Sequence, residues 1–198
     1  SLYYAKGEYR KAIEAFQHCL DIKREIFGDS SATIGVSYNN IAVTYEKMGD
    51  YRQALKALQS SLAVNQRTYP EDHIEMAHIY MNLSSLYNRM GHYEEALTYS
   101  TMAVDISTKH YQNSEPLKLA RAINSLADIY AQLGDYEKTF PLIRQSIKIY
   151  EDTLGKDHPD TSYVMMREAD LLFELKRYED ASEIYAKILD IQTRGLRD

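Results

Sequence analysis

The 198-residue sequence is short of residues that interrupt or cross-link a chain: it has one cysteine, no tryptophan, four prolines and eight glycines. A single cysteine, Cys19, cannot form an internal disulfide, which favours an intracellular protein, and we expect a cytoplasmic location. No apolar run approaches the roughly 18 residues of a membrane-spanning helix. The opening residues 1–6 also lack the apolar core of a signal peptide. Proline and glycine interrupt helices, so their small number favours long helices.

Charge and composition narrow the class of protein further. Lysine and arginine number 23 against 29 aspartates and glutamates, which gives a net charge of −6. Nucleic-acid binding is therefore not expected, because phosphate contacts need a concentrated basic face. Hydrophobic residues make up 44% and charged residues 26%, which is ordinary for a folded domain and argues against disorder.

Motifs that carry chemistry are missing from the sequence. There is no phosphate-binding GxxxxGK[ST] loop and no GxGxxG turn. The six histidines are scattered, with no HExxH motif and no second cysteine, so a zinc site is not expected. No arrangement of serine, histidine and aspartate suggests a catalytic triad. We therefore predict no enzyme activity, no catalytic residues, no metal and no cofactor.

Thirteen of the 18 tyrosines fall in series with a common period. One series, at intervals of 42 or 43 residues, consists of Tyr9, Tyr51, Tyr93, Tyr136 and Tyr178. A second series has the same spacing and consists of Tyr3, Tyr45, Tyr87 and Tyr130. A fixed period in this range indicates stacked supersecondary units. We predict a single array over residues 1–198, with repeats at about 1–29 (truncated), 30–71, 72–114, 115–157 and 158–198.

Each repeat is predicted to contain two helices. In the second repeat, one apolar stripe of helical spacing is formed by Tyr38, Ile41, Ala42 and Tyr45. Gly49 then suits a short turn between helices. A second stripe, on a helix expected to reach about Thr68, is formed by Ala54, Leu55, Leu58 and Leu62. Between repeats, Pro159 suits the first turn of a helix, and Asp157 is the expected cap.

The pattern Tyr38-x2-Ile41-Ala42-x2-Tyr45, followed by Ala54-x3-Leu58, resembles the tetratricopeptide repeat. Its long second helix, its 42-residue period and the turn Leu154-Gly155-Lys156-Asp157-His158-Pro159 are similar to the repeats of kinesin light chains. The phrase Asn39-Asn40-Ile41-Ala42 is similar as well. This resemblance covers the whole chain and implies an all-α fold, a right-handed superhelical solenoid of antiparallel helix pairs.

The fifth repeat departs from the pattern. It has Glu168 where the others have Ile41, Leu83 and Leu126. A carboxylate buried there without a partner would cost free energy. Either the repeat is displaced, or Arg144 or Arg167 pairs with Glu168, or this end is more open. No polar capping helix follows residues 194–198, and we expect the chain to be a fragment of a longer array.

The resemblance also implies that the first helix of each repeat lines a concave face. The expected peptide-binding residues on this face are Asn39, Asn40, Val43, His78, Met81, Asn82, Ser85, Asn88, Arg89, Arg121, Asn124, Asp128, Tyr163, Met166 and Asp170. Asparagine is a poor residue for a helix interior, so its recurrence here is informative. Its amide can pair with both groups of an extended peptide backbone. Alternatively, these amides bond neighbouring helices or face water.

Charge on this face is uneven. We hypothesise that it prefers an acidic segment near Arg89 and Arg121 and a basic or apolar one near Asp170; the alternative is that these charges are simply solvated. The resemblance to kinesin light chains implies an acidic peptide with an aromatic or leucine anchor. The leading prediction is a protein–protein interaction scaffold or adaptor. The alternatives are a peptide-sensing regulator and a segment that self-associates through the uncapped ends of the array.

Overall fold

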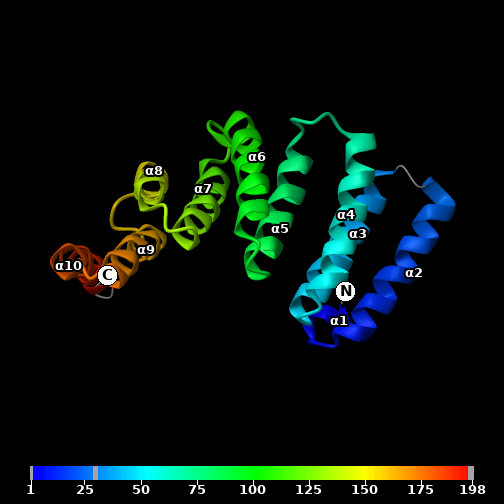
Figure 1. The fold of residues 1–198 in the computed structure, drawn as a ribbon, viewed down its shortest axis with the longest axis horizontal. Helices are drawn as coiled ribbons and strands as arrows, with labels where there is room; N and C mark the ends of the chain where they lie inside the picture. The colour runs from blue at the N-terminus through cyan, green and yellow to red at the C-terminus, as the bar shows by residue number, and fades with distance from the viewer. Residues whose placement is uncertain (1, 29–30, 196–198) are drawn as a thin grey trace. The chain divides into compact units, whose positions relative to one another are not determined.

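The computed structural model describes residues 2–28 and 31–195, and these are helical with short connecting turns (Figure 1). Leu196–Asp198, on which part of the expectation about the uncapped end rests, lie outside the described residues. The helices are α1 (Leu2–Ala5), α2 (Tyr9–Phe27), α3 (Ala32–Lys47), α4 (Tyr51–Thr68), α5 (Ile74–Arg89), α6 (Tyr93–Tyr111), α7 (Pro116–Gln132), α8 (Tyr136–Leu154), α9 (Pro159–Glu174) and α10 (Tyr178–Gly195).

The predicted helix pairs are confirmed. Every second helix of a pair begins at a tyrosine of the first series, and a short turn precedes it. Gly49 occupies this turn with φ of 79°, a left-handed conformation that glycine adopts at little cost. The fifth repeat has lost its glycine, and Lys176 adopts the same conformation there with φ of 61°. A side chain at this position carries a steric cost.

The chain divides into two compact units, Ser1–Ile106 and Ser107–Asp198, with the boundary inside α6. In unit 1, the core is built around fully buried side chains on α2 to α5, among them Leu20, Ile34, Leu58, Met76 and Leu83. Small residues let the paired helices approach: Ala54 and Ser61 are fully buried. Ser61 Oγ donates a hydrogen bond of 2.9 Å to the carbonyl oxygen of Gly35.

Tyr87, a member of the second tyrosine series, belongs to an aromatic cluster in unit 1. The rings of Tyr87 and Tyr99 are stacked, with centroids 5.7 Å apart, and Tyr80 lies against Tyr99 at 5.8 Å. Burial, reinforced by the neighbouring Tyr99 and Glu95, raises the pKa of Tyr87 above its ordinary value. These three tyrosines therefore contribute to the packing of unit 1.

In unit 2, the carboxylate of Glu168 in the fifth repeat has a charged partner. Its side chain is buried, and Arg144 Nε on α8 lies 2.8 Å from Glu168 Oε1 on α9. The paired alternative is therefore correct, with Arg144 rather than Arg167 as the partner. Around this pair, the unit buries Ile123, Ile129 and Leu172 almost completely.

One local expectation is wrong. The α9 cap is His158 rather than Asp157: His158 Nδ1 accepts a hydrogen bond of 3.1 Å from the backbone N–H of Asp160. The single cysteine, Cys19 on α2, is exposed.

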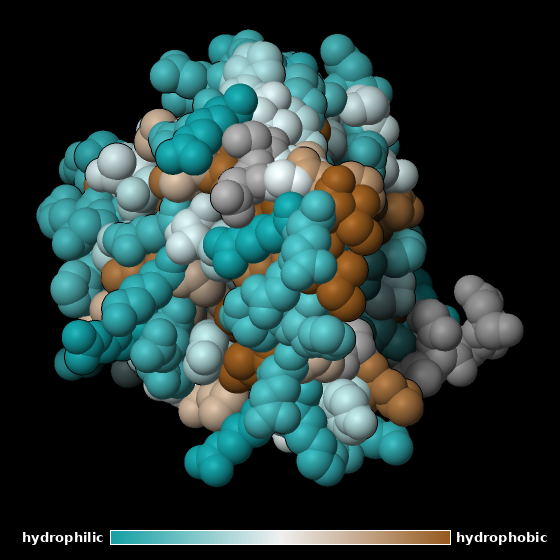
Figure 2. Space-filling view, turned by 90° about the vertical axis from the view of Figure 1, so that its right-hand side faces the viewer, coloured by the Kyte–Doolittle hydropathy of each residue, from teal (hydrophilic) through white to brown (hydrophobic). Residues whose placement is uncertain are grey.

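The surface of unit 1 is mostly hydrophilic on the side where α2 lies, with hydrophobic atoms between the charged side chains (Figure 2). On α2, Ile22, Ile26 and Phe27 are exposed. Within the described part of the chain, none of the helices is sufficiently long and apolar to span a bilayer.

Candidate functional site

Each unit contains a pocket built in the same way, from the first helix of one repeat, its second helix, and the first helix of the next repeat. We call them pocket 1 and pocket 2. Pocket 1, of about 410 Å³, lies among α3, α4 and α5 and is lined by Val36, Asn39, Asn65, Glu75, His78 and Asn82, among others. Pocket 2, of about 400 Å³, lies among α7, α8 and α9 and is lined by Arg121, Asn124, Asp128, Tyr150, Tyr163 and Arg167, among others.

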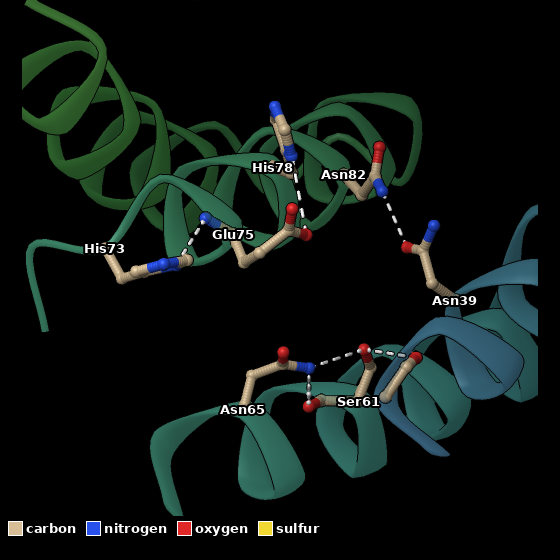
Figure 3. A network of polar contacts seen from close by, with 8 residues as sticks. Asn39, Ser61, Asn65, His73, Glu75, His78 and Asn82 are labelled. Atoms are coloured by element: carbon tan, nitrogen blue, oxygen red, sulfur yellow. Dashed lines mark hydrogen bonds and ion pairs between the residues drawn. The ribbon is translucent and has the colours of Figure 1, made fainter. Parts of the chain in front are cut away.

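In pocket 1, two amides connect neighbouring repeats. Asn82 Nδ2 on α5 donates a hydrogen bond of 2.7 Å to Asn39 Oδ1 on α3 (Figure 3). Within the described residues, neither Asn39 Nδ2 nor Asn82 Oδ1 forms another hydrogen bond. The pair therefore keeps one donor and one acceptor, which matches the N–H and C=O of a peptide unit. These two asparagines bond neighbouring helices, as one interpretation has it, and their role in peptide binding stays a prediction.

A third amide comes from α4. Asn65 is 4% exposed, and its Nδ2 donates a hydrogen bond of 2.8 Å to the carbonyl oxygen of Ser61. Gly35 of α3 makes room for it, because a Cβ at Gly35 would lie 2.2 Å from Asn65 Nδ2. A backbone carbonyl only accepts hydrogen bonds, so it fixes which end of the amide carries nitrogen. The oxygen of Asn65 points to the α5 side of the pocket (Figure 3).

The opposite wall of pocket 1 carries ionisable groups at the start of α5. His73 Nδ1 caps this helix by accepting a hydrogen bond of 3.3 Å from the backbone N–H of Glu75, and the His73 ring stacks on Tyr69 at 4.1 Å. The Glu75 carboxylate lies 3.6 Å from His78 Nδ1, and both side chains are partly exposed. The carboxylate of Glu75 points toward His78 (Figure 3).

Pocket 2 has more charged groups. Arg167 on α9 forms an ion pair with Asp128 on α7, and burial lowers the pKa of Arg167 below its ordinary value. Arg167 Nε and Asn124 Oδ1 are buried without a hydrogen-bond partner among the described residues. Arg121 is exposed and forms no ion pair there, and Tyr163 is 68% exposed. Pocket 2 therefore offers a free guanidinium group beside an aromatic ring and unsatisfied polar atoms.

The two pockets occupy equivalent positions two repeats apart. Asn39 corresponds to Asn124, and His78 to Tyr163. The amide of Asn82 corresponds to the guanidinium group of Arg167. Related positions thus carry different chemistry, which the repeat pattern alone does not reveal.

The structure brings eight of the predicted residues into these pockets: Asn39, His78, Met81 and Asn82 in pocket 1, and Arg121, Asn124, Asp128 and Tyr163 in pocket 2. The others lie outside their linings: Asn40, Val43, Ser85, Asn88, Arg89, Met166 and Asp170. Two of these have partners of their own. Arg89 Nε lies 2.8 Å from Glu46 Oε1, and Asp170 Oδ1 accepts a hydrogen bond of 2.6 Å from the hydroxyl of Tyr185.

Sequence reasoning did not select Asn65, Glu75, Tyr150 or Asp160 for these pockets. Asn65 and Tyr150 lie near the ends of second helices, which the family resemblance does not place on the concave face. Glu75 and Asp160 lie in the first turn of first helices. The available signal was an asparagine at position 65, in register with Ser107 and Tyr150, inside an otherwise apolar stripe.

Comparison with known families shows which family the chain belongs to. The tetratricopeptide repeat family model matches residues 1–67, 33–109 and 118–194, so the chain belongs to the tetratricopeptide repeat family. Proteins of this family bind protein partners, and their helix-pair fold generally serves as a non-catalytic scaffold for such interactions. The fold is the all-α repeat class that the sequence predicts.

Several solved structures are similar to this chain in fold. A Podosopora anserina protein described as a kinesin light chain with nearly identical TPR-like repeats is 20% identical, with a TM-score of 0.86 over 99% of this chain and 92% of its own. BtubC of P. vanneervenii is also 20% identical, with a TM-score of 0.74 over 94% of this chain and 74% of its own. The apo form of RapI is 16% identical, with a TM-score of 0.71 over 99% and 81%.

At these identities the likeness concerns the fold alone. In fold, the repeats are similar to those of the kinesin light chain structure, which agrees with the resemblance seen in the sequence. No curated protein matches the sequence. The chemistry of the two pockets is therefore what indicates the kind of partner.

Proposed function

We propose that this protein is a non-catalytic interaction scaffold that binds a short, extended peptide segment of a partner protein. The observation that carries the proposal is the amide pair of Asn39 and Asn82, which keeps one donor and one acceptor on the pocket 1 surface. Such groups hold a peptide backbone without demanding a particular sequence. Asn124 occupies the equivalent place in pocket 2 and supports the same role there.

Pocket 2 supplies side-chain selectivity in this proposal. Among the described residues, the exposed guanidinium group of Arg121 has no ion-pair partner. A carboxylate of the partner protein can pair with it, because guanidinium–carboxylate hydrogen bonds are among the stronger ones. The exposed ring of Tyr163 offers contact area for an aromatic or leucine side chain. Arg121 and Tyr163 therefore support the proposal of an acidic peptide with an aromatic or leucine anchor.

The test is an unbiased peptide-display selection on the full chain, run beside the double variant Asn82→Ala, Asn124→Ala. A shared motif that is lost on the double variant supports binding through the pocket amides. The matched control is Asn40→Ala, which removes an exposed amide outside both pockets and should leave the selection unchanged. A motif that survives on the double variant, or no enrichment at all, would remove the proposal.

A further inference from the structure

We propose that pocket 1 is a subsite for a cationic side chain, the ammonium group of a lysine or the guanidinium group of an arginine, carried by the bound segment. This inference rests on the proposed peptide-binding function and gives it a chemical preference. It comes from the juxtaposition of Asn65 and Glu75, on opposite walls of the same pocket.

The first observation is an acceptor without a donor. Asn65 is 96% buried, yet its Oδ1 receives no hydrogen bond from any described residue. Its amide cannot simply turn over, because Nδ2 is held by the Ser61 carbonyl and seated over Gly35. The oxygen is therefore fixed toward the pocket (Figure 3). Asn65 Oδ1 is not among the fully buried atoms that lack a partner, so the oxygen lies at the pocket surface, where a donor group of a ligand can reach it.

The second observation is the sign of the charge. Glu75 is the only residue lining pocket 1, within the part of the chain described, that is permanently charged at neutral pH. The lining contains no lysine or arginine, and Arg89 nearby in sequence is bound to Glu46. An anionic ligand group would meet no lysine or arginine in the pocket 1 lining, and the Glu75 carboxylate would repel it.

The donor set suits an organic cation. Ammonium offers three donors and guanidinium five, so one such group can serve both the Asn65 oxygen and the Glu75 carboxylate, which line the same pocket. A hard divalent ion needs six or more oxygen ligands. The described residues contain no cluster of three histidine, cysteine, aspartate or glutamate side chains that would begin such a site. The apolar wall of Val36, Ile79 and Met81 fits the alkyl stem of a long basic side chain.

Pocket 2 provides an internal contrast. Asp160 corresponds to Glu75, but Tyr150 replaces Asn65, so the acceptor that faces the acid in pocket 1 has no equivalent, and the unpartnered acceptor of pocket 2 is Asn124 Oδ1 on α7 instead. Arg121 and Arg167 add two guanidinium groups to the lining. We therefore assign the preference for a cation to pocket 1 alone. His78 lies 3.6 Å from the Glu75 carboxylate and competes with the ligand for it.

The probe is Nα-acetyl-arginine N-methylamide, titrated into the isotope-labelled full chain and followed by amide NMR shifts. The uncharged comparison is Nα-acetyl-norleucine N-methylamide, which keeps the alkyl stem. We expect the arginine probe to shift resonances around Glu75 and Asn65 and to bind at least about fivefold more tightly than norleucine. Glu75→Gln should abolish this difference, because a neutral amide provides no charge.

Two further variants separate binding from structure. Asn65→Ser copies the residue at the equivalent position 107, so the helix should tolerate it, and it should weaken the arginine probe. His78→Ala should leave that affinity unchanged or strengthen it, since it frees the carboxylate. The matched control Asp160→Asn changes the equivalent acid of pocket 2 and should have no effect.

The proposal is overturned if arginine binds no better than norleucine, or if Glu75→Gln leaves the preference intact. The peptide selection separates the two proposals. Enriched peptides without a basic residue, unaffected by Glu75→Gln, would overturn the cation subsite and leave peptide binding standing. No enriched peptides, with arginine still bound at Glu75, would support the subsite and remove the peptide-binding function.

Discussion

At the scale of single residues, the ion pair of Arg144 and Glu168 shows how the fifth repeat accommodates a carboxylate at a core position. Glu168 is 7% exposed, while the Arg144 side chain is 65% exposed. The arginine therefore reaches from the surface to a buried acid, and also lies over the ring of Phe140 at 6.0 Å. Burying an unpaired carboxylate would be costly.

We predict that Arg144→Ala lowers the free energy of unfolding by about 1–2 kcal/mol, because the partly solvated arginine is the only charge paired with Glu168 among the described residues. Glu168→Leu, which restores the residue type of the other repeats, should be neutral or stabilising. The measurement is urea denaturation of both variants and of the double variant. If Arg144→Ala is equally harmful in the Glu168→Leu background, the ion pair does not explain the cost.

A second residue-scale prediction concerns the turn before α10. Lys176 adopts a left-handed conformation that glycine adopts in the equivalent turns. Lys176→Gly should therefore raise the stability of the folded chain by about 1 kcal/mol. The reciprocal variant Gly134→Lys should destabilise by a similar amount, as measured by thermal unfolding. An unchanged or lower melting temperature for Lys176→Gly would contradict this account.

At the scale of elements, the repeat pattern specifies the helices well. The tyrosine series marks the start of each second helix, and buried small residues such as Ala54 mark where paired helices approach. The repeat period and the size of each residue are properties of the sequence itself, so they predict the helices without knowledge of the fold. Which side chains meet across helices cannot be read in this way. Arg144 and Arg167 were equal candidates for Glu168 until the rotation of α8 and α9 placed them.

The candidate site was predicted less completely than the helices. Asn39, Asn82 and Asn124 were recognised because asparagine is unfavourable inside a helix. The bond between Asn39 and Asn82 spans 43 residues, and no local signal specifies it. Asn65 was not selected because the family resemblance assigns binding to first helices only, whereas its orientation depends on the space left by Gly35.

Helix capping gives a prediction for a whole element. His158 caps α9 by accepting a hydrogen bond from the backbone of Asp160, and His73 caps α5 in the same way. His158→Ala should destabilise the chain by about 1 kcal/mol, and His158→Asp should retain the cap. Thermal unfolding followed by circular dichroism compares the variants. Equal melting temperatures for the alanine and aspartate variants would argue against a capping role.

At the scale of the whole molecule, two equivalent pockets carry unlike chemistry. Pocket 1 combines three amides with one carboxylate, and pocket 2 combines two guanidinium groups with two carboxylates. Each pocket can hold the backbone of a bound segment through its asparagine amides while selecting different side chains. On this account, the amides supply affinity, and the charged and aromatic side chains of each pocket supply specificity.

The most direct test of this account is the affinity of a selected peptide for the full chain, measured by isothermal titration with wild type, Asn82→Ala and Asn124→Ala. Each variant should weaken binding by about tenfold, the cost of a lost hydrogen bond that leaves a partner unsatisfied. Asn40→Ala should bind as tightly as wild type. Unchanged affinity for both pocket variants would contradict the claim that the pocket amides hold the partner.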